Sequence, residues 1–258
     1  MTAPVVLTGE ELTLAEVWEV AVHGAAAELG DDARERMGAA RALVDGVRGE
    51  HTYGVNTGFG RFVSAHIPDE LAEELQLRLL RSHACGVGEP YPADVVRAAM
   101  LLRANALAKG FSGARVTTVE LLLECLNRGV LPRVPARGSV GASGDLAPLA
   151  HLALPLVGEG QALVDGELLN GTAALRSVGL QPIRLASKEG LSLVNGTQFM
   201  AAMGALGAVR ARRLAVAHVH RQVVHLGVVR ERHDRAIAEL HEIGQVVVQR
   251  IAVPLITG

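Results

Sequence analysis

Apolar residues recur at intervals of three and four along much of the first half of the chain, which is the spacing of helices with one buried face. In the segment 12–28, four apolar residues fall on one side of the predicted helix: Leu14, Val17, Trp18 and Val22. Further helices are predicted over 69–82, 92–109 and 114–128, each followed by glycine or proline within a few residues. The pattern therefore predicts a mainly α-helical chain.

The segment 31–48 has the same spacing and predicts a second helix. Its apolar side consists of Met37, Ala40, Leu43, Val44 and Val47. Asp31 and Asp32 stand where this helix begins, and aspartate is a preferred N-cap residue. We therefore expect these aspartates to cap the helix.

Two stretches interrupt the helical pattern. The sequence HTYGVNTGFGRF at 51–62 contains three glycines and predicts a loop. Between 158 and 171, apolar and polar residues alternate around Asp165-Gly166, a pair that type I′ hairpin turns favour. The helical pattern returns from Lys188 onward, so the expected fold is mainly α with one small β-hairpin.

Composition restricts the class of protein. The chain has 258 residues, 49% of them hydrophobic, enough for one large domain or two modest ones. A net charge of −2 gives no reason to expect nucleic acid or an anionic membrane as partner, and no apolar run reaches membrane-spanning length. The first residues lack the basic start of a secretory signal. With only Cys85 and Cys125, a reduced cytoplasmic compartment is the expected location.

The sequence GSVGASGDLAPLAH at 138–151 concentrates small residues before an apolar run. Its glycines, Gly138, Gly141 and Gly144, do not have the G-x-G-x-x-G spacing, and no Lys-Ser/Thr pair follows them, so phosphate binding is disfavoured. Asp145 is a good N-cap residue, and Pro148 falls in the first turn, where proline is tolerated. Ala-Ser-Gly is therefore predicted to lie at the start of a helix.

Three small residues permit a backbone reaction that bulky side chains would block. Glycine lets the amide nitrogen of Gly144 approach the carbonyl carbon of Ala142, and the hydroxyl of Ser143 can leave as water. The product is a five-membered ring with an exocyclic methylene, which is an electrophile. The positive end of the following helix would stabilise the negative charge that develops when an amine adds to it.

This segment resembles the signature of the aromatic amino acid ammonia-lyase family, in which Ala-Ser-Gly cyclises to 4-methylideneimidazole-5-one (MIO). YGVNTGFG at 53–60 and EGLSLVNGTQFM at 189–200 match further family motifs, and SHACGVGEP at 82–90 is most similar to the histidine ammonia-lyase branch. The resemblance covers roughly residues 5–207. It implies the helical ammonia-lyase fold, here its N-terminal half only, and elimination of ammonia from L-histidine to give trans-urocanate. It also implies a homotetramer and no external cofactor.

The resemblance also assigns roles to individual residues. Ala142, Ser143 and Gly144 would form the MIO group. Asn195 would position that ring by hydrogen bonding. Tyr53 matches the tyrosine that acts as acid and base and removes the β-proton of the substrate.

Three other residues have assignments in which a structural role competes with a functional one. His83 would face the substrate ring, because an imidazole can hydrogen-bond the imidazole of histidine whereas a phenyl ring would leave it unpaired. A lone histidine is otherwise most often a structural hydrogen-bonding residue. Asp145 is expected to be both a helix cap and an assistant in ring formation, and Gln198 is a supporting residue of the site.

The end of the chain departs from the family pattern. Residues 208–258 hold eight arginines and four acidic residues, a formal charge of +4, whereas residues 1–207 carry −6. The segment like RPHPGQ that the family leads to is not recognisable. We therefore divide the chain into a catalytic region, 1–207, and an atypical helical tail, 208–258, and take a frameshift or truncation as the hypothesis for its origin.

No metal site is expected in this tail. His218 and His220 point to different faces of a helix, and neither a cysteine nor a paired carboxylate completes a site with His225.

Two alternatives to a histidine ammonia-lyase remain open. A tyrosine or phenylalanine ammonia-lyase or aminomutase would keep the same electrophile and differ in the ring pocket. An inactive truncated homologue would lack the residues that bind the substrate carboxylate, which the family supplies from its other half. No residue of this chain is assigned to that role.

Overall fold

In the computed structural model, the described residues are 3–47, 52–55, 57, 64, 67–68, 71–139 and 143–226. The α-helices are α1 Leu14–Val22, α2 Asp31–Asp45, α3 Ala72–His83, α4 Ala93–Ala108, α5 Val116–Asn127, α6 Leu146–Ala153, α7 Gly171–Ser177, α8 Glu189–Val194 and α9 Gln198–Leu226, and a 3-10 helix spans Leu154–Val157. The strands are β1 Val5–Leu7, β2 Ala27–Leu29, β3 Val87–Pro90, β4 Leu131–Pro132, β5 Pro135–Arg137, β6 Gln161–Val164 and β7 Glu167–Asn170.

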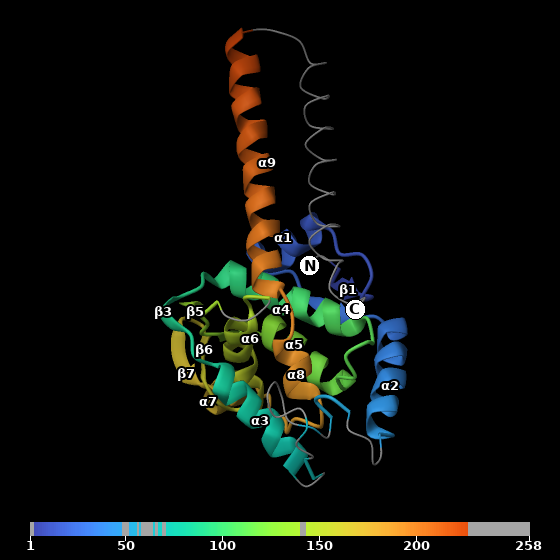
Figure 1. The fold of residues 1–258 in the computed structure, drawn as a ribbon. Coiled ribbons are helices and arrows are strands. Elements are labelled where there is room, and N and C mark those ends of the chain that lie inside the picture. Colours follow the sequence, from blue (N-terminus) through green and yellow to red (C-terminus); the bar gives the residue numbers. More distant parts are fainter. Residues whose placement is uncertain are drawn as a thin grey trace.

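The structure confirms the mainly α-helical fold, with short strands at the margin of the helices (Figure 1). The predicted hairpin is present as β6 and β7, which pair antiparallel. Asp165 and Gly166 connect them with φ angles of +49° and +84°, so both turn residues have the left-handed conformation that a type I′ turn requires. The Asp-Gly pair thus identified this turn correctly.

The predicted helix over 12–28 is too long. It ends at Val22, after which Gly24 has a φ of +75° and Ala27–Leu29 forms β2. Strand β2 pairs parallel with β1, in the register Val5 to Ala27. A left-handed glycine next to the end of a helix turns the chain out of the helical path, and the three residues of β2 are too few to show a strand period.

The start of α2 also differs from expectation. Gly30 occupies the N-cap position, while Asp31 and Asp32 lie in the first turn and do not cap the helix. There, their negative charges interact favourably with the positive end of the α2 dipole. Leu43, assigned to the apolar face of this helix, is 77% exposed, whereas Met37 is buried.

Helix α4 lies at the centre of the core. It packs against α1, α5 and α9, and most of its side chains are buried. Figure 1 shows it crossing the middle of the molecule, with α9 rising from it. Helix α1 begins at a capping box in which Thr13 and Glu16 satisfy each other's backbone amides.

Helix α9 extends well beyond the other helices (Figure 1). It continues without a break through residue 207, where the sequence suggested a boundary, and that division stays a prediction. Its lower part is fastened to the body by an ion pair between Arg210 and Asp94 and by the guanidinium of Arg213, 4.2 Å from the centre of the Trp18 ring. Within the described ranges, no helix is both long and apolar enough to cross a bilayer.

Two helical glycines give opposite predictions for substitution by alanine. A Cβ at Gly190 in α8 would lie 2.7 Å from the backbone oxygen of Gln76 in α3, so Gly190→Ala must push the two helices apart. A Cβ at Gly38 in α2 would have no atom within 4 Å. In urea unfolding, we expect Gly190→Ala to lower the free energy of unfolding by about 2 kcal/mol and Gly38→Ala to raise it by roughly 1 kcal/mol. Equal effects of the two changes would contradict the close packing of α8 on α3.

Candidate active site

The segment before α6 needs its small residues for packing. Gly144 has a φ of +78°, and a Cβ there would lie 2.8 Å from Oγ of Ser139. A Cβ at Gly138 would lie 2.9 Å from Cα of Gly86, in the segment that follows α3. The backbone amide of Asp145 donates to Oγ of Ser143 at 3.3 Å. The described part of this loop is therefore closely packed, and Ala142 lies outside the described residues.

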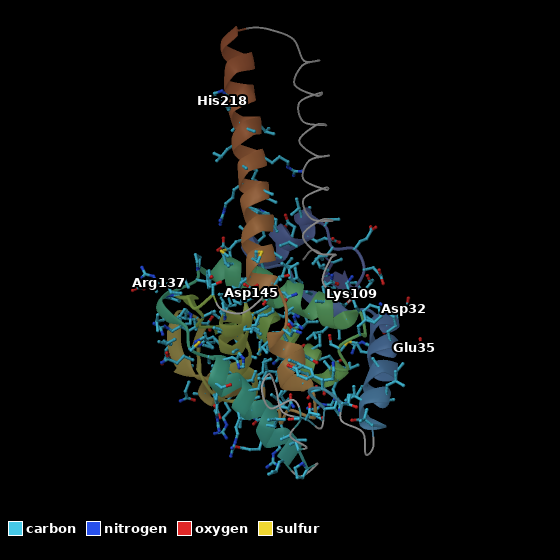
Figure 2. All side chains as sticks on the ribbon, viewed as in Figure 1. Asp32, Glu35, Lys109, Arg137, Asp145 and His218 are labelled. Carbon is cyan, nitrogen blue, oxygen red and sulfur yellow. The ribbon has the colours of Figure 1, made fainter. Side chains whose placement is uncertain are left out.

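Asp145 stands at the N-cap position of α6, but its side chain makes no capping bond to that helix. Its Oδ2 instead accepts from the backbone amides of Phe199, at 2.8 Å, and Met200, at 3.1 Å, so it caps α9. Figure 2 labels Asp145 near the lower end of α9. Burial raises the pKa of this carboxyl, and the two amides act in the opposite direction. Asp145 thus caps a helix, as expected, but the helix that its side chain caps is α9 and not α6.

Asn195 lies in the break between α8 and α9. Helix α8 ends at Val194, and Asn195 has extended backbone angles, φ −87° and ψ 98°. Its side chain is exposed, and α9 begins three residues later at Gln198. The carboxylate of Asp145 caps the first turn of α9, so the described residues of the Ala-Ser-Gly segment and those of the Asn-Gly-Thr-Gln segment are brought together.

His83 is the last residue of α3. Its Nδ1 lies 2.9 Å from the backbone oxygen of Leu79 and 3.0 Å from Oγ of Ser82. In the tautomer that donates to the Leu79 carbonyl, Nδ1 carries the hydrogen. In the neutral ring, Nε2 is then an acceptor. The side chain is partly exposed. This arrangement suits an imidazole that accepts a hydrogen bond from a ligand.

His151 on α6 holds the segment that follows His83. Its Nε2 accepts from the backbone amide of Gly86 at 3.0 Å, and burial, with a smaller effect of Arg133, lowers the pKa of this imidazole. A neutral ring is required, because a protonated Nε2 would have no lone pair to accept with. The sequence contained His151 within the matched motif, but its spacing gave no sign of this contact.

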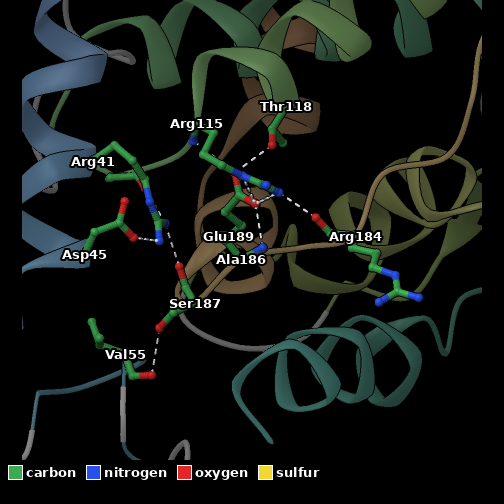
Figure 3. A network of polar contacts seen from close by, with 10 residues as sticks. Arg41, Asp45, Val55, Arg115, Thr118, Arg184, Ala186, Ser187 and Glu189 are labelled. Carbon is green, nitrogen blue, oxygen red and sulfur yellow. Dashed lines mark hydrogen bonds and ion pairs between the residues drawn. The ribbon is translucent and has the colours of Figure 1, made fainter. Parts of the chain in front are cut away.

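Tyr53 lies in a turn and is 48% exposed. Two residues later, the backbone oxygen of Val55 accepts from Oγ of Ser187 at 2.8 Å, and the backbone oxygen of Ser187 accepts from Nη1 of Arg41 at 2.8 Å (Figure 3). The turn that carries Tyr53 is therefore attached to the segment before α8 and, through it, to α2.

Glu189 is the centre of a buried network beside this attachment (Figure 3). It is completely buried and accepts from the backbone amide and the guanidinium of Arg115, from Oγ1 of Thr118 at 2.6 Å, and from the amide of Ala186 at 2.8 Å. A buried carboxylate needs such partners. The network fixes the start of α8, the helix that leads to Asn195.

The described residues contain no group of three or more histidines, cysteines or acidic residues placed to hold a metal ion. His218 lies on α9, and the side chains of His220 and His225 are outside the described part of the chain.

Comparison with known proteins gives a consistent result. The sequence model of the aromatic amino acid lyase family matches residues 12–249. Histidine ammonia-lyase of Symbiobacterium thermophilum is 54% identical over 201 residues, which cover 77% of this chain and 40% of that protein. The chain thus spans less than half the length of this relative.

Solved structures show the same relationship. Histidine ammonia-lyase from Trypanosoma cruzi superimposes with a TM-score of 0.76 and 43% identity, over 83% of this chain and 42% of that one. Phenylalanine aminomutase of Pantoea agglomerans superimposes with a TM-score of 0.77 and 29% identity, over 100% of this chain and 55% of the other. Because the family model covers most of the chain and the fold agrees with these structures, the chain belongs to the aromatic amino acid lyase family.

Proposed function

We propose that this chain carries the electrophile-forming part of a histidine ammonia-lyase, which eliminates ammonia from L-histidine to give trans-urocanate. The observation that carries the proposal is the contact of Asp145 with the amides of Phe199 and Met200, which joins the Ala-Ser-Gly motif to the motif that contains Asn195. The 54% and 43% identities to two histidine ammonia-lyases support the choice of substrate.

The described residues fit the formation of MIO. Gly144 has a φ of +78°, so the chain at this point takes a left-handed conformation that few other residues adopt. Ser143 supplies the hydroxyl that leaves, and Asp145, whose carboxyl is buried, lies two residues later. When formed from Ala142, Ser143 and Gly144, the group supplies an electrophile for the amino group of the substrate.

The remaining residues take the roles that the resemblance implies. Asn195 positions the ring by hydrogen bonding, with Gln198 in support, and Tyr53 takes the β-proton of the substrate. His83 accepts a hydrogen bond from the substrate imidazole through Nε2, which is consistent with the donation of Nδ1–H to Leu79.

Intact mass and turnover test this proposal separately. We expect the purified chain to be lighter than its sequence by two water molecules, one from closure of the Gly144 nitrogen on the Ala142 carbonyl carbon and one from Ser143, and to absorb in the near ultraviolet. Mixing it with L-histidine and recording urocanate absorbance tests turnover by the chain itself. A chain with its full mass would support an inert homologue, whereas a cyclised chain without turnover would show that the electrophile forms and that residues outside this sequence are needed.

His83→Phe tests the choice of substrate. At the matching position of a full-length histidine ammonia-lyase, we expect this change to lower kcat/KM for L-histidine by about tenfold to a hundredfold, because the substrate imidazole loses its hydrogen-bond partner. Activity with L-phenylalanine and L-tyrosine is measured in parallel. An unchanged preference for histidine would remove His83 as the selecting residue and leave the tyrosine or phenylalanine alternative open for this chain.

The proposal includes assembly and location. The site is completed in a homotetramer, in which other parts of the subunits bind the substrate carboxylate. Cys85 and Cys125 are both free thiols, which suits the reducing cytoplasm.

A further inference from the structure

Arg103 is a buried cation in the middle of α4. Only 3% of it is exposed, and it lies among the apolar side chains of the core. In the part of the chain that the structure describes, no carboxylate forms an ion pair with it. Burial lowers the pKa of this guanidinium to about 10, so it stays protonated at neutral pH. Burying an unpaired charge is costly, and its retention calls for a specific use.

The hydrogen-bond partners of Arg103 lie in the last turn of α8, in the break after it and at the first residue of α9. Its Nη1 donates to the backbone oxygen of Asn195 at 2.9 Å and to Oε1 of Gln198 at 2.8 Å, and its Nη2 donates to the backbone oxygen of Ser192. The carbonyls at the end of a helix lack partners within the helix and carry its negative pole. Arg103 therefore caps the end of α8 and holds the start of α9 with the same guanidinium.

Gly196 makes this arrangement possible. A Cβ at this position would lie 2.2 Å from Nη1 of Arg103 and 2.0 Å from Oε1 of Gln198. The guanidinium therefore passes directly beside the backbone of the Asn195-Gly196 break, in space that only glycine leaves open.

We propose that Arg103 is a positioning residue for the active site, because it fixes Asn195 and Gln198 in the break between α8 and α9. The inference rests on the proposed function and extends it to a residue of α4. Gln198 immediately precedes Phe199 and Met200, whose amides hold Asp145. Arg103 thus acts on the Ser143-Gly144 segment through the first turn of α9.

Arg103→Lys, with Arg97→Lys as its control, tests the proposal. Arg97 lies on the same helix and also donates to backbone oxygens near helix ends, those of Val20 and Leu126, but it does not contact the α8–α9 break. Lysine keeps the charge and loses the planar fork that reaches several acceptors. We expect most of the Arg103→Lys chain to retain the two waters of an uncyclised segment, whereas Arg97→Lys cyclises as fully as the unaltered chain. Equal cyclisation of both variants would overturn the proposal.

Hydrogen exchange of the folded chains provides a readout that does not depend on cyclisation. The amides from Asn195 to Met200 should exchange about tenfold faster in Arg103→Lys than in the unaltered chain, and at an unchanged rate in Arg97→Lys. If the unaltered chain keeps its full mass, the proposed electrophile is wrong, and this comparison still decides whether Arg103 holds the break. Unchanged exchange in Arg103→Lys would refute the inference.

If Arg103→Lys does not fold, Gly196→Ala tests whether Arg103 positions the break between α8 and α9. It displaces Arg103 and Gln198 without removing either, and Gly207→Ala on α9, where a Cβ meets nothing within 4 Å, is its control. We expect incomplete cyclisation and faster exchange at residues 195–200 only in Gly196→Ala. The same behaviour in both alanine variants would contradict the role of Arg103.

Discussion

The Ser143→Ala variant is expected to keep its full mass, without the loss of two waters, and to show no near-ultraviolet absorbance from a ring. Alanine has no hydroxyl to leave, so an exocyclic methylene cannot form at this position. Relative to the uncyclised chain, stability should change by less than about 1 kcal/mol, since Oγ of Ser143 accepts a single hydrogen bond, from the Asp145 amide at 3.3 Å. Intact-mass spectrometry and a urea unfolding curve on the same sample make the two measurements.

Ser139→Ala is the matched control for this experiment. Ser139 lies in the same loop, is exposed, and has its Oγ beside Gly144, but it has no part in ring formation. The Ser139 variant should lose two waters as the unaltered chain does. Loss of two waters from Ser143→Ala would show that another residue is dehydrated, and the assignment of the electrophile to Ser143 would fail.

Glu189→Gln is expected to have the largest effect on stability, a loss of about 3 kcal/mol in the free energy of unfolding. The carboxylate of Glu189 is completely buried and accepts every bond that reaches it, from Arg115, Thr118 and the Ala186 amide. A glutamine amide replaces one accepting oxygen by a donor that faces other donors. It also leaves the guanidinium of Arg115 without its charged partner.

The control for this prediction is Glu124→Gln. Glu124 pairs with Arg128 one turn along α5, and both side chains are exposed by nearly half. Removing such a pair should cost less than about 0.5 kcal/mol. If the two glutamine variants unfold at the same urea concentration, burial of the Glu189 network is not what stabilises the start of α8.

The helices were predictable because most of them bury one face on the core, and this leaves a period in the sequence. The exceptions have local physical reasons. Strands β1 and β2 are three residues each and become strands only by pairing with each other, so no period marks them. The exposure of Leu43 depends on which side of α2 packs against α4 and α5. The spacing of apolar residues within α2 does not determine that side.

Residues of the candidate site could be predicted only where they stand in a short sequence motif of the family. Ser143, Gly144 and Asn195 stand in short matched segments, and the roles proposed for them stay predictions. Arg103 and Glu189 were missed because the partners of Arg103, and Arg115 and Thr118 as partners of Glu189, lie more than 70 residues away in sequence. One signal was available for Arg103: in the run AAMLLRANALA the one other polar residue is Asn105, and a buried charge in such a run needs a polar partner. Asp145 was expected to bond within its own helix, since nothing local indicates a partner 54 residues later.

The hydrogen bond that the Phe199 amide donates to Asp145 also implies an order of events during synthesis. A chain that has left the ribosome only as far as α6 contains Ser143 and Gly144 but not the amides that anchor their neighbour. The contact that holds Asp145 can form only after the first turn of α9 has emerged and docked. We therefore expect the proposed cyclisation to follow this docking, and a nascent chain halted before residue 199 to keep its full mass.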